Sequence, residues 1–344
     1  MEALLPPWTL QISFIVFGIA ALLTIAGCIQ LTLAGQVLAS RTGWGDALFG
    51  SIFFGLATSL SGIVITVVSA IDDQPQLAYS NAVGGISAQT MAIAIADIFY
   101  RRGNLEHAAA SLTNLLLGCL LIGMLSIALV ATFTPDLQLL GVHPASLALL
   151  AFYLGGLMLI KRNGEAPMWR PVRTPTTHPE SDAAGQTDCH GTPWLWAVFL
   201  LLALGVSLGG WAVSNAGQSI VEESGLRAGF VGAVMMGLIN ALPETVTSVV
   251  AVKRGATALA ISMIIGGNSL DVLNLAIGDL AYRGGSLYHA AGNDELLVTT
   301  LSLLMTAMLL AGLLIRQAKG WGSIGFEGVL MLSIYALGVL MLYF

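Results

Sequence analysis

Long apolar runs alternate with short polar connections along almost the whole chain. A helix that crosses a bilayer needs about 20 predominantly apolar residues. Ten runs come close to or exceed this length, and we predict one membrane-spanning helix in each. These helices cover residues 11–35, 46–71, 76–100, 107–133, 144–160, 193–216, 227–252, 257–281, 294–315 and 322–343.

One connection differs from the others because it is long and polar. Residues 161–192 are rich in Pro, Thr and Gly, a composition typical of flexible linkers. We therefore expect three parts. The first five helices form a unit at 1–160, a linker loop follows at 161–192, and the second five helices form a unit at 193–344.

The two units share their sequence. Residues 27–109 align with 209–291 at a constant offset of 182, and 28 of the 83 aligned pairs are identical. Internal symmetry in an apolar chain is typical of secondary transporters. The sequence thus predicts a duplicated transporter fold.

Composition supports a polytopic membrane protein. The chain is 56% hydrophobic and only 9% charged, whereas soluble domains carry about 25% charged residues. We expect it in the plasma membrane, or in the inner membrane of a bacterium. The chain has no cofactor motif, nucleophile–base pair or histidine cluster, so we do not expect an enzyme or a bound cofactor. Without a basic patch, the expected partners are small cations and the lipid bilayer, and not nucleic acid.

Basic residues predict how the helices are oriented, because they concentrate on the cytoplasmic side of membrane proteins. Eleven fall on one side of the predicted spans, and only Arg227 and Arg283 fall on the other. We expect the first side and the 161–192 loop to be cytoplasmic, with both termini outside. The eleven are Arg41, Arg101, Arg102, Lys161, Arg162, Arg170, Arg173, Lys253, Arg254, Arg316 and Lys319.

The odd number of helices per unit makes the repeat an inverted one. After five spans the chain lies on the opposite side of the membrane, so the second unit enters upside down. The predicted fold is an all-α polytopic membrane protein of ten transmembrane helices, arranged as two inverted-topology five-helix repeats.

Two acids lie inside predicted spans, where a charged side chain costs about 2.5–3.5 kcal/mol and is usually functional. Glu244 directly follows Pro243, which breaks a helix and frees a backbone carbonyl. Asp271 lies near the middle of the next span, close to Asn268. Because a short hairpin joins the two spans, the acids are expected at similar depth, in an oxygen-rich site suited to a hard cation. The alternative is a hydrogen-bonded acid pair that only holds helices together.

Two further acids lie near span ends and are repeat equivalents. Asp97 and Asp279 each precede an arginine by four residues, Arg101 and Arg283. That spacing places acid and base on one helix face, and we predict an ion pair at each site that anchors the span end. The alternative is that these acids take part in transport.

The segment GLINALPETVTSVVAVKRGATALAISMIIGGNSLD at 237–271 resembles an α-repeat of the cation/calcium exchanger superfamily, which includes sodium/calcium and proton/calcium antiporters. The family has a G-x-(S/T)-x-P-E stretch in one helix and a G-S-N-x-x-(N/D) stretch in the next. The resemblance implies that Glu244 and Asp271 coordinate the transported ion. It also implies that Asn240 and Ala241 contribute oxygens one turn earlier.

The resemblance also implies a gate. The first and sixth helices of the family slide over the core, and here they are the spans that carry Gln36 and Gln218.

The first unit departs from the family pattern. Gly62 stands at the position equivalent to Glu244, and Gln89 at the position equivalent to Asp271. Thr58 and Ser59 remain as neutral oxygen donors in this unit. The predicted cation site therefore comprises Glu244, Asp271, Asn240, Thr58, Ser59, Gln89 and Asn268.

Two carboxylates balance one divalent cation, or one to two monovalent cations or protons. We expect a secondary active antiporter that exchanges Ca²⁺ for H⁺ or Na⁺ by alternating access. There are two alternatives. In the first, the same fold transports a monovalent cation or another small solute. In the second, the protein is a non-transporting membrane scaffold that uses the 161–192 loop for docking.

Overall fold

The computed structural model describes residues 9–100, 103–139, 141–165, 167–174, 177, 191–223, 241–318, 320 and 324–343. Within these ranges the regular structure is helical, apart from one isolated bridge between Leu139 and Val142. The first unit contains α1 (Leu10–Thr42), α2 (Asp46–Phe49), the π-helix η1 (Gly50–Phe54), α3 (Gly55–Ile71), α4 (Pro75–Gly84), α5 (Ile86–Tyr100), α6 (Leu105–Ala108), α7 (Leu112–Ala131) and α8 (Pro144–Glu165). The second contains α9 (Thr192–Glu223), α12 (Leu242–Lys253), α13 (Thr257–Ala281), α14 (Asn293–Ile315) and α15 (Phe326–Tyr343).

The helices agree with the hydropathy pattern, and the chain is a multi-pass membrane protein. Eight helical segments of the described chain are long and apolar enough to cross a membrane, and α15 is a shorter apolar helix. The remaining predicted span, 227–252, contains α12, while its residues 227–240 lie outside the described residues. The predicted all-α polytopic fold is thus confirmed.

Two of the spans are interrupted at points that hydropathy does not reveal. The second span changes from α2 through the π-helix η1 to α3, and the third passes from α4 to α5 next to Gly85. Single π-turns inside helices are frequent near functional sites. Both interruptions lie in helices that contribute polar residues to the interior.

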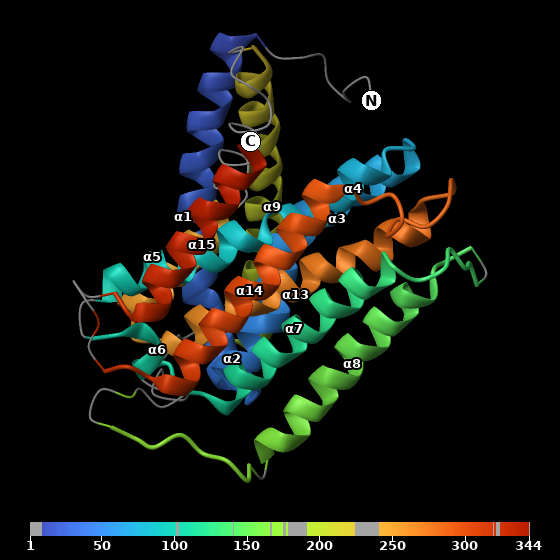
Figure 1. The fold of residues 1–344 in the computed structure, drawn as a ribbon. Coiled ribbons are helices and arrows are strands. Elements are labelled where there is room, and N and C mark those ends of the chain that lie inside the picture. Colours follow the sequence, from blue (N-terminus) through green and yellow to red (C-terminus); the bar gives the residue numbers. More distant parts are fainter. Residues whose placement is uncertain are drawn as a thin grey trace.

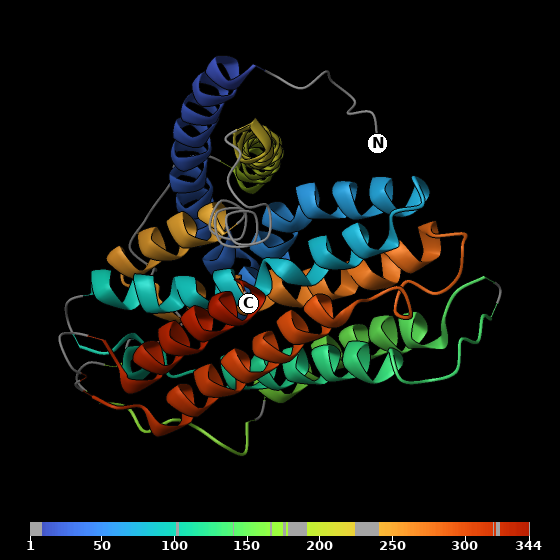
Figure 2. The same cartoon turned by 45° about the horizontal axis from the view of Figure 1, so that its top comes forward.

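Helix α13 occupies the centre of the bundle, between α3, α7 and α12 (Figures 1 and 2). Glycines allow the closest approach. Gly266 of α13 lies against the backbone of Ser51, and Gly55 of α3 lies against Gly266, so a Cβ on either glycine would overlap backbone atoms. This packing brings the polar residues of α3 next to those of α13.

Helices α1 and α9 form a separate pair. They lie side by side and run in a different direction from the remaining helices (Figures 1 and 2). Most of their apolar surface is exposed on the outside of the bundle. Helix α1 contacts α12 and helix α9 contacts α3, so the pair packs against the helices that carry the predicted site.

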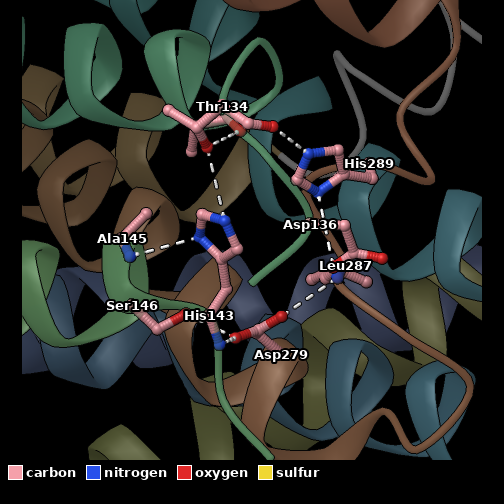
Figure 3. A network of polar contacts seen from close by, with 9 residues as sticks. Thr134, Asp136, His143, Ala145, Ser146, Asp279, Leu287 and His289 are labelled. Atoms are coloured by element: carbon pink, nitrogen blue, oxygen red, sulfur yellow. Dashed lines mark hydrogen bonds and ion pairs between the residues drawn. The ribbon is translucent and has the colours of Figure 1, made fainter. Parts of the chain in front are cut away.

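The end of α13 is held by a buried carboxylate. Asp279 accepts hydrogen bonds from the backbone N–H of His143 (2.7 Å) and Leu287 (3.0 Å) and from the Ser146 hydroxyl (2.7 Å) (Figure 3). We call this region, with the neighbouring His289, the α13 pole. His289 also contacts the Thr134 carbonyl oxygen, at 2.6 Å.

The end of α5 repeats this arrangement at the opposite end of the bundle, where α6 lies (Figures 1 and 2). Asp97 accepts hydrogen bonds from the backbone N–H of Leu105 (2.7 Å) and Gly325 (3.0 Å). Both donors are equivalents, at the offset of 182, of the residues that donate backbone N–H groups to Asp279. We call this region the α6 pole. The matching contacts at opposite ends are what an inverted repeat requires.

The predicted ion pair between Asp279 and Arg283 is wrong. Both residues are described, and no ion pair joins them. Helix α13 ends at Ala281, so Arg283 follows the helix and does not share a helix face with Asp279. The carboxylate instead caps backbone amides. The equivalent prediction for Asp97 rests on Arg101, which lies outside the described residues.

Candidate functional site

Glu244 lies in the first turn of α12, where Pro243 starts the helix. Its side chain is 3% exposed. The Gln89 side chain of α5 donates a hydrogen bond from Nε2 to Glu244 Oε1, at 3.3 Å. The Thr58 hydroxyl of α3 lies near the carboxylate and donates to the Phe54 and Gly55 carbonyls at 3.1 and 3.2 Å. Residues of both repeats therefore surround this acid.

Asp271 faces the same space from the middle of α13. The Ser59 hydroxyl, which donates to the Gly267 carbonyl at 3.4 Å, and the Gln89 amide lie near its carboxylate. Asp271 and Glu244 are close enough for their negative charges to repel one another. The predicted hairpin accounts for this proximity, since α12 ends at Lys253 and α13 begins at Thr257.

Several buried oxygens of this cluster have no hydrogen-bond partner among the described residues: Glu244 Oε2, Gln89 Oε1, Asn268 Oδ1 and Asn274 Oδ1. Asn268 uses its amide nitrogen to donate to Thr90 Oγ1 at 2.9 Å, so its oxygen is the atom left over. A buried polar atom without a partner costs about 1–3 kcal/mol. Carboxylate and amide oxygens are the ligands of hard cations, so the chemistry of this set fits a cation.

The structure thus brings together most of the residues that the sequence singled out. Glu244, Asp271, Gln89, Thr58 and Ser59 converge as described, and Asn268 lies one helical turn before Asp271. Asn240 lies outside the described residues.

The Ala241 carbonyl already accepts two hydrogen bonds from Thr245, at 2.9 Å from its backbone nitrogen and 2.7 Å from its hydroxyl. This carbonyl is thus engaged within α12 and does not point freely into the cluster.

One neighbour was missed by reasoning from the sequence. Asn81 of α4 donates from Nδ2 to the Gly62 carbonyl and to Thr66 Oγ1, both at 2.8 Å. The signal was available, because Asn81 is an amide inside a predicted span. Its partner Gly62 is the position at which the first repeat lacks an acid.

The space at Gly62 is lined by polar groups. A Cβ at this position would lie 3.6 Å from Asn274 Nδ2, 3.8 Å from Asn81 Nδ2 and 4.0 Å from Asp271 Oδ1. Amide groups therefore stand near the position where the second repeat has a carboxylate. In keeping with this, no group of three or more His, Cys, Asp or Glu residues within the described ranges could hold a metal ion.

Gln36 of α1 lies away from the two acids. Its Oε1 accepts a hydrogen bond from Arg254 Nε at 2.7 Å, which links α1 to the connection between α12 and α13. The side chain of Gln218, the equivalent residue on α9, lies outside the described residues.

Comparison with known proteins identifies a family that matches both repeats. The family described as sodium/calcium exchanger protein matches residues 12–161 and 194–344. No curated protein sequence gives a significant match.

Solved structures of the sodium–calcium exchanger NCX_Mj share the fold. The form soaked with zero Na⁺ and Ca²⁺ has a TM-score of 0.67 at 15% identity, covering 97% of this chain and 100% of that chain. The form soaked with 10 mM Na⁺ and 10 mM Sr²⁺ has a TM-score of 0.67 at 16% identity, covering 96% and 99%. At this identity the likeness concerns the fold over nearly the full length of both chains.

Proposed function

Because this chain belongs to the sodium/calcium exchanger family, we propose that it is a secondary active antiporter that exchanges Ca²⁺ for H⁺ or Na⁺ at the site between Glu244 and Asp271. The observation that supports this proposal most strongly is the buried pair of acids, next to which several oxygens have no hydrogen-bond partner. Two like charges held together in a dry interior repel one another, and a bound cation relieves that repulsion.

The charges favour one divalent cation at a time. Glu244 and Asp271 together supply two negative charges, which one Ca²⁺ neutralises. Ca²⁺ takes about six to eight oxygen ligands. Gln89, Asn268 and the hydroxyl of Thr58 supply neutral oxygens beside the carboxylates. Protons or Na⁺ would replace Ca²⁺ on the same carboxylates, which makes the two cargoes mutually exclusive.

Alternating access would follow from the inverted repeats, with α1 and α9 as the moving pair. These helices lie side by side, run in a different direction from the bundle and touch it near the site. Sliding of this pair would expose the site first to one side of the membrane and then to the other.

The absence of an acid at Gly62 supports a second candidate. With only two carboxylates, the site could serve a monovalent cation. A ligand that binds only the folded state stabilises it, and at a given concentration the ligand that binds more tightly stabilises it more. A thermal-shift comparison of Ca²⁺, Na⁺ and K⁺ therefore separates the two candidates, since the proposed function requires the largest shift with Ca²⁺.

Ion flux into proteoliposomes tests the proposed function. With an opposing pH or Na⁺ gradient, the wild-type protein should take up Ca²⁺, and Glu244→Gln and Asp271→Asn should each reduce uptake about tenfold or more, because each removes a charged ligand worth about 1.5–3 kcal/mol. The exposed Asp294→Asn is the matched control and should transport normally. Undiminished uptake by both site variants would refute the site.

A further inference from the structure

The two poles of the repeat share their backbone contacts but differ in the side chains added to them. At the α6 pole, Glu106 and Glu327 lie close to Asp97. Their equivalents at the α13 pole, at the same offset of 182, are Tyr288 and Ala145. Neither acid is needed for the shared cap, and the transport site does not use them.

The α6-pole acids are all buried, with Asp97 and Glu106 1% exposed and Glu327 0% exposed. The carboxylate of Asp97 accepts hydrogen bonds from two backbone N–H groups, which offset the cost of its burial. Glu327 Oε1 accepts a hydrogen bond from Asn104 Nδ2 at 2.7 Å. In contrast, both carboxylate oxygens of Glu106 and Oε2 of Glu327 have no donor among the described residues.

The surrounding helices are shaped to admit Glu327. A Cβ on Gly312 of α14 would overlap the Glu327 side chain, and a Cβ on Gly325 would overlap the contact between Glu327 and Asn104. In the first repeat, Val130 stands at the position equivalent to Gly312, and Ala145 at the position equivalent to Glu327. This pole is thus a built pocket for an additional carboxyl group.

Only negative charges act on Glu106 within the described part of the chain. Burial, followed by the charges of Asp97 on α5 and Glu327 on α15, raises the pKa of Glu106 well above its usual range. Nearby basic groups are engaged elsewhere. Arg316 donates to the carbonyl oxygens of Val172 and His107, and Arg254 donates to Gln36, while Lys253 lies over the Phe99 ring.

The imidazole of His107, the residue next to Glu106, is also engaged. It contacts the Arg316 carbonyl oxygen at 2.7 Å and Thr174 Oγ1 at 2.9 Å. Among the side chains that the structure describes, Glu327 is the one within hydrogen-bond reach of the Glu106 carboxyl, which also lies near its own backbone N–H. Two carboxylates in contact can form a hydrogen bond only if one of them carries a proton.

We propose that Glu106 and Glu327 form a proton-binding site at the α6 pole, in which a protonated Glu106 donates a hydrogen bond to Glu327 Oε2. Release of the proton to water leaves two carboxylates facing each other, with Asp97 as a third negative charge nearby. The repulsion then acts between α6, α5 and α15 and loosens this end of the bundle at alkaline pH. The site is separate from Glu244 and Asp271, so it does not depend on the proposed transport function.

The pH dependence of thermal unfolding tests this site, with the full-length protein in detergent. A buried acid whose pKa is raised by folding stabilises the native state at low pH and loses that contribution as the pH rises. Glu106→Gln keeps a donor for Glu327 and cannot ionise. It should match the wild type at acidic pH and unfold about 2 °C or more higher at alkaline pH. The exposed Asp294→Asn is the control and should follow the wild type throughout.

Infrared spectroscopy supplies a second readout. In a Glu244→Gln, Asp271→Asn background, the carbonyl band of a protonated carboxylic acid should persist at neutral pH and disappear when Glu106→Gln is added. An unchanged band, or a Glu106→Gln protein with the wild-type pH dependence, would overturn the proposal. The proposal would also be overturned if Ca²⁺ stabilised this background only when Glu106 is present, because the acids would then form a cation site and not a proton site.

Discussion

At the scale of single residues, the proposed cation site contains different side chains at equivalent positions of the two repeats. Glu244 in the second repeat corresponds to Gly62 in the first, and Asp271 corresponds to Gln89. The structure places all four around one buried space, in which Gln89 donates to Glu244 and a Cβ at Gly62 would lie 4.0 Å from Asp271 Oδ1. One repeat supplies both charges, and the other supplies neutral oxygens and an amide donor.

A carboxylate restored at Gly62 should strengthen cation binding. Gly62→Asp adds a third negative charge near Asp271, and Gly62→Ala adds the same Cβ without the charge. Atoms 3.6–4.0 Å from that Cβ are at ordinary van der Waals distance, so both variants should fold. We expect Gly62→Asp to bind Ca²⁺ at least about tenfold more tightly than Gly62→Ala, measured from the calcium-dependent rise in Tm. Equal affinities would show that Gly62 does not face the ion.

A site residue could be predicted from the sequence when it stands out clearly against the apolar pattern of its span. Glu244 and Asp271 are charges inside spans, and the repeat alignment led to Gln89. Asn81 was overlooked because an amide inside a span is a weak signal, and its hydrogen bond to the Gly62 carbonyl exists only in the folded chain. Asn240 was predicted from the family resemblance, and its position stays a prediction.

At the scale of helices, the point at which a span ends determines whether a nearby acid forms an ion pair or accepts hydrogen bonds from backbone amides. The spacing of Asp279 and Arg283 predicted a pair on one helix face, but α13 ends at Ala281 between them and its last residues approach the His143 and Leu287 amides instead. The predicted span 257–281 ends where α13 does, so the error lay in assuming that the helix continues beyond its apolar run as far as Arg283.

Mutation of the two residues should separate capping from ion pairing. Asp279→Ala removes three hydrogen bonds to a charged acceptor, each worth about 1.5–3 kcal/mol, and should lower the Tm strongly. Arg283→Ala changes an exposed side chain and should alter stability by no more than about 0.5 kcal/mol. Thermal unfolding of the two purified variants is the measurement. Equal destabilisation would restore the ion pair as the main interaction.

The interruptions of the second and third spans could not be foreseen from hydropathy. Apolar content is the same whether a turn is α or π, so the pattern predicted single helices over 46–71 and 76–100. The structure instead has η1 at Gly50–Phe54 and a junction between α4 and α5. At η1, Gly50 and Gly55 allow close contact with the backbone of α13, and such contacts are determined by tertiary packing and not by the local sequence.

At the scale of the whole molecule, most of the fold was predictable because bilayer thickness sets the length of each span. The repeat and the apolar runs predict a polytopic helical fold of the kind observed, and the structural likeness to a sodium–calcium exchanger extends over 97% of this chain. The family resemblance singled out the first and sixth helices as a gate, but the pairing of α1 with α9 and their separate direction were not predicted.

The orientation in the membrane stays a prediction, and it can be measured by cysteine accessibility. In a background without the three native cysteines, Met168→Cys lies in the linker, at a position that is 99% exposed. We expect a membrane-impermeant thiol reagent to label it only from the cytoplasm, because the eleven basic residues predict that side as cytoplasmic. Asp294→Cys, at the opposite end of the bundle, should show the reverse. Labelling with the sides exchanged would invert the topology.

The central claim is that one hard cation binds between Glu244 and Asp271. Anomalous diffraction from crystals soaked with Sr²⁺, a heavier congener of Ca²⁺, tests it most directly. The expected result is a single strong peak within ligand distance of both carboxylates and of Gln89 Oε1, which Ca²⁺ displaces and which Glu244→Gln abolishes. A protein that gives no peak there while Sr²⁺ binds at another position would contradict the claim.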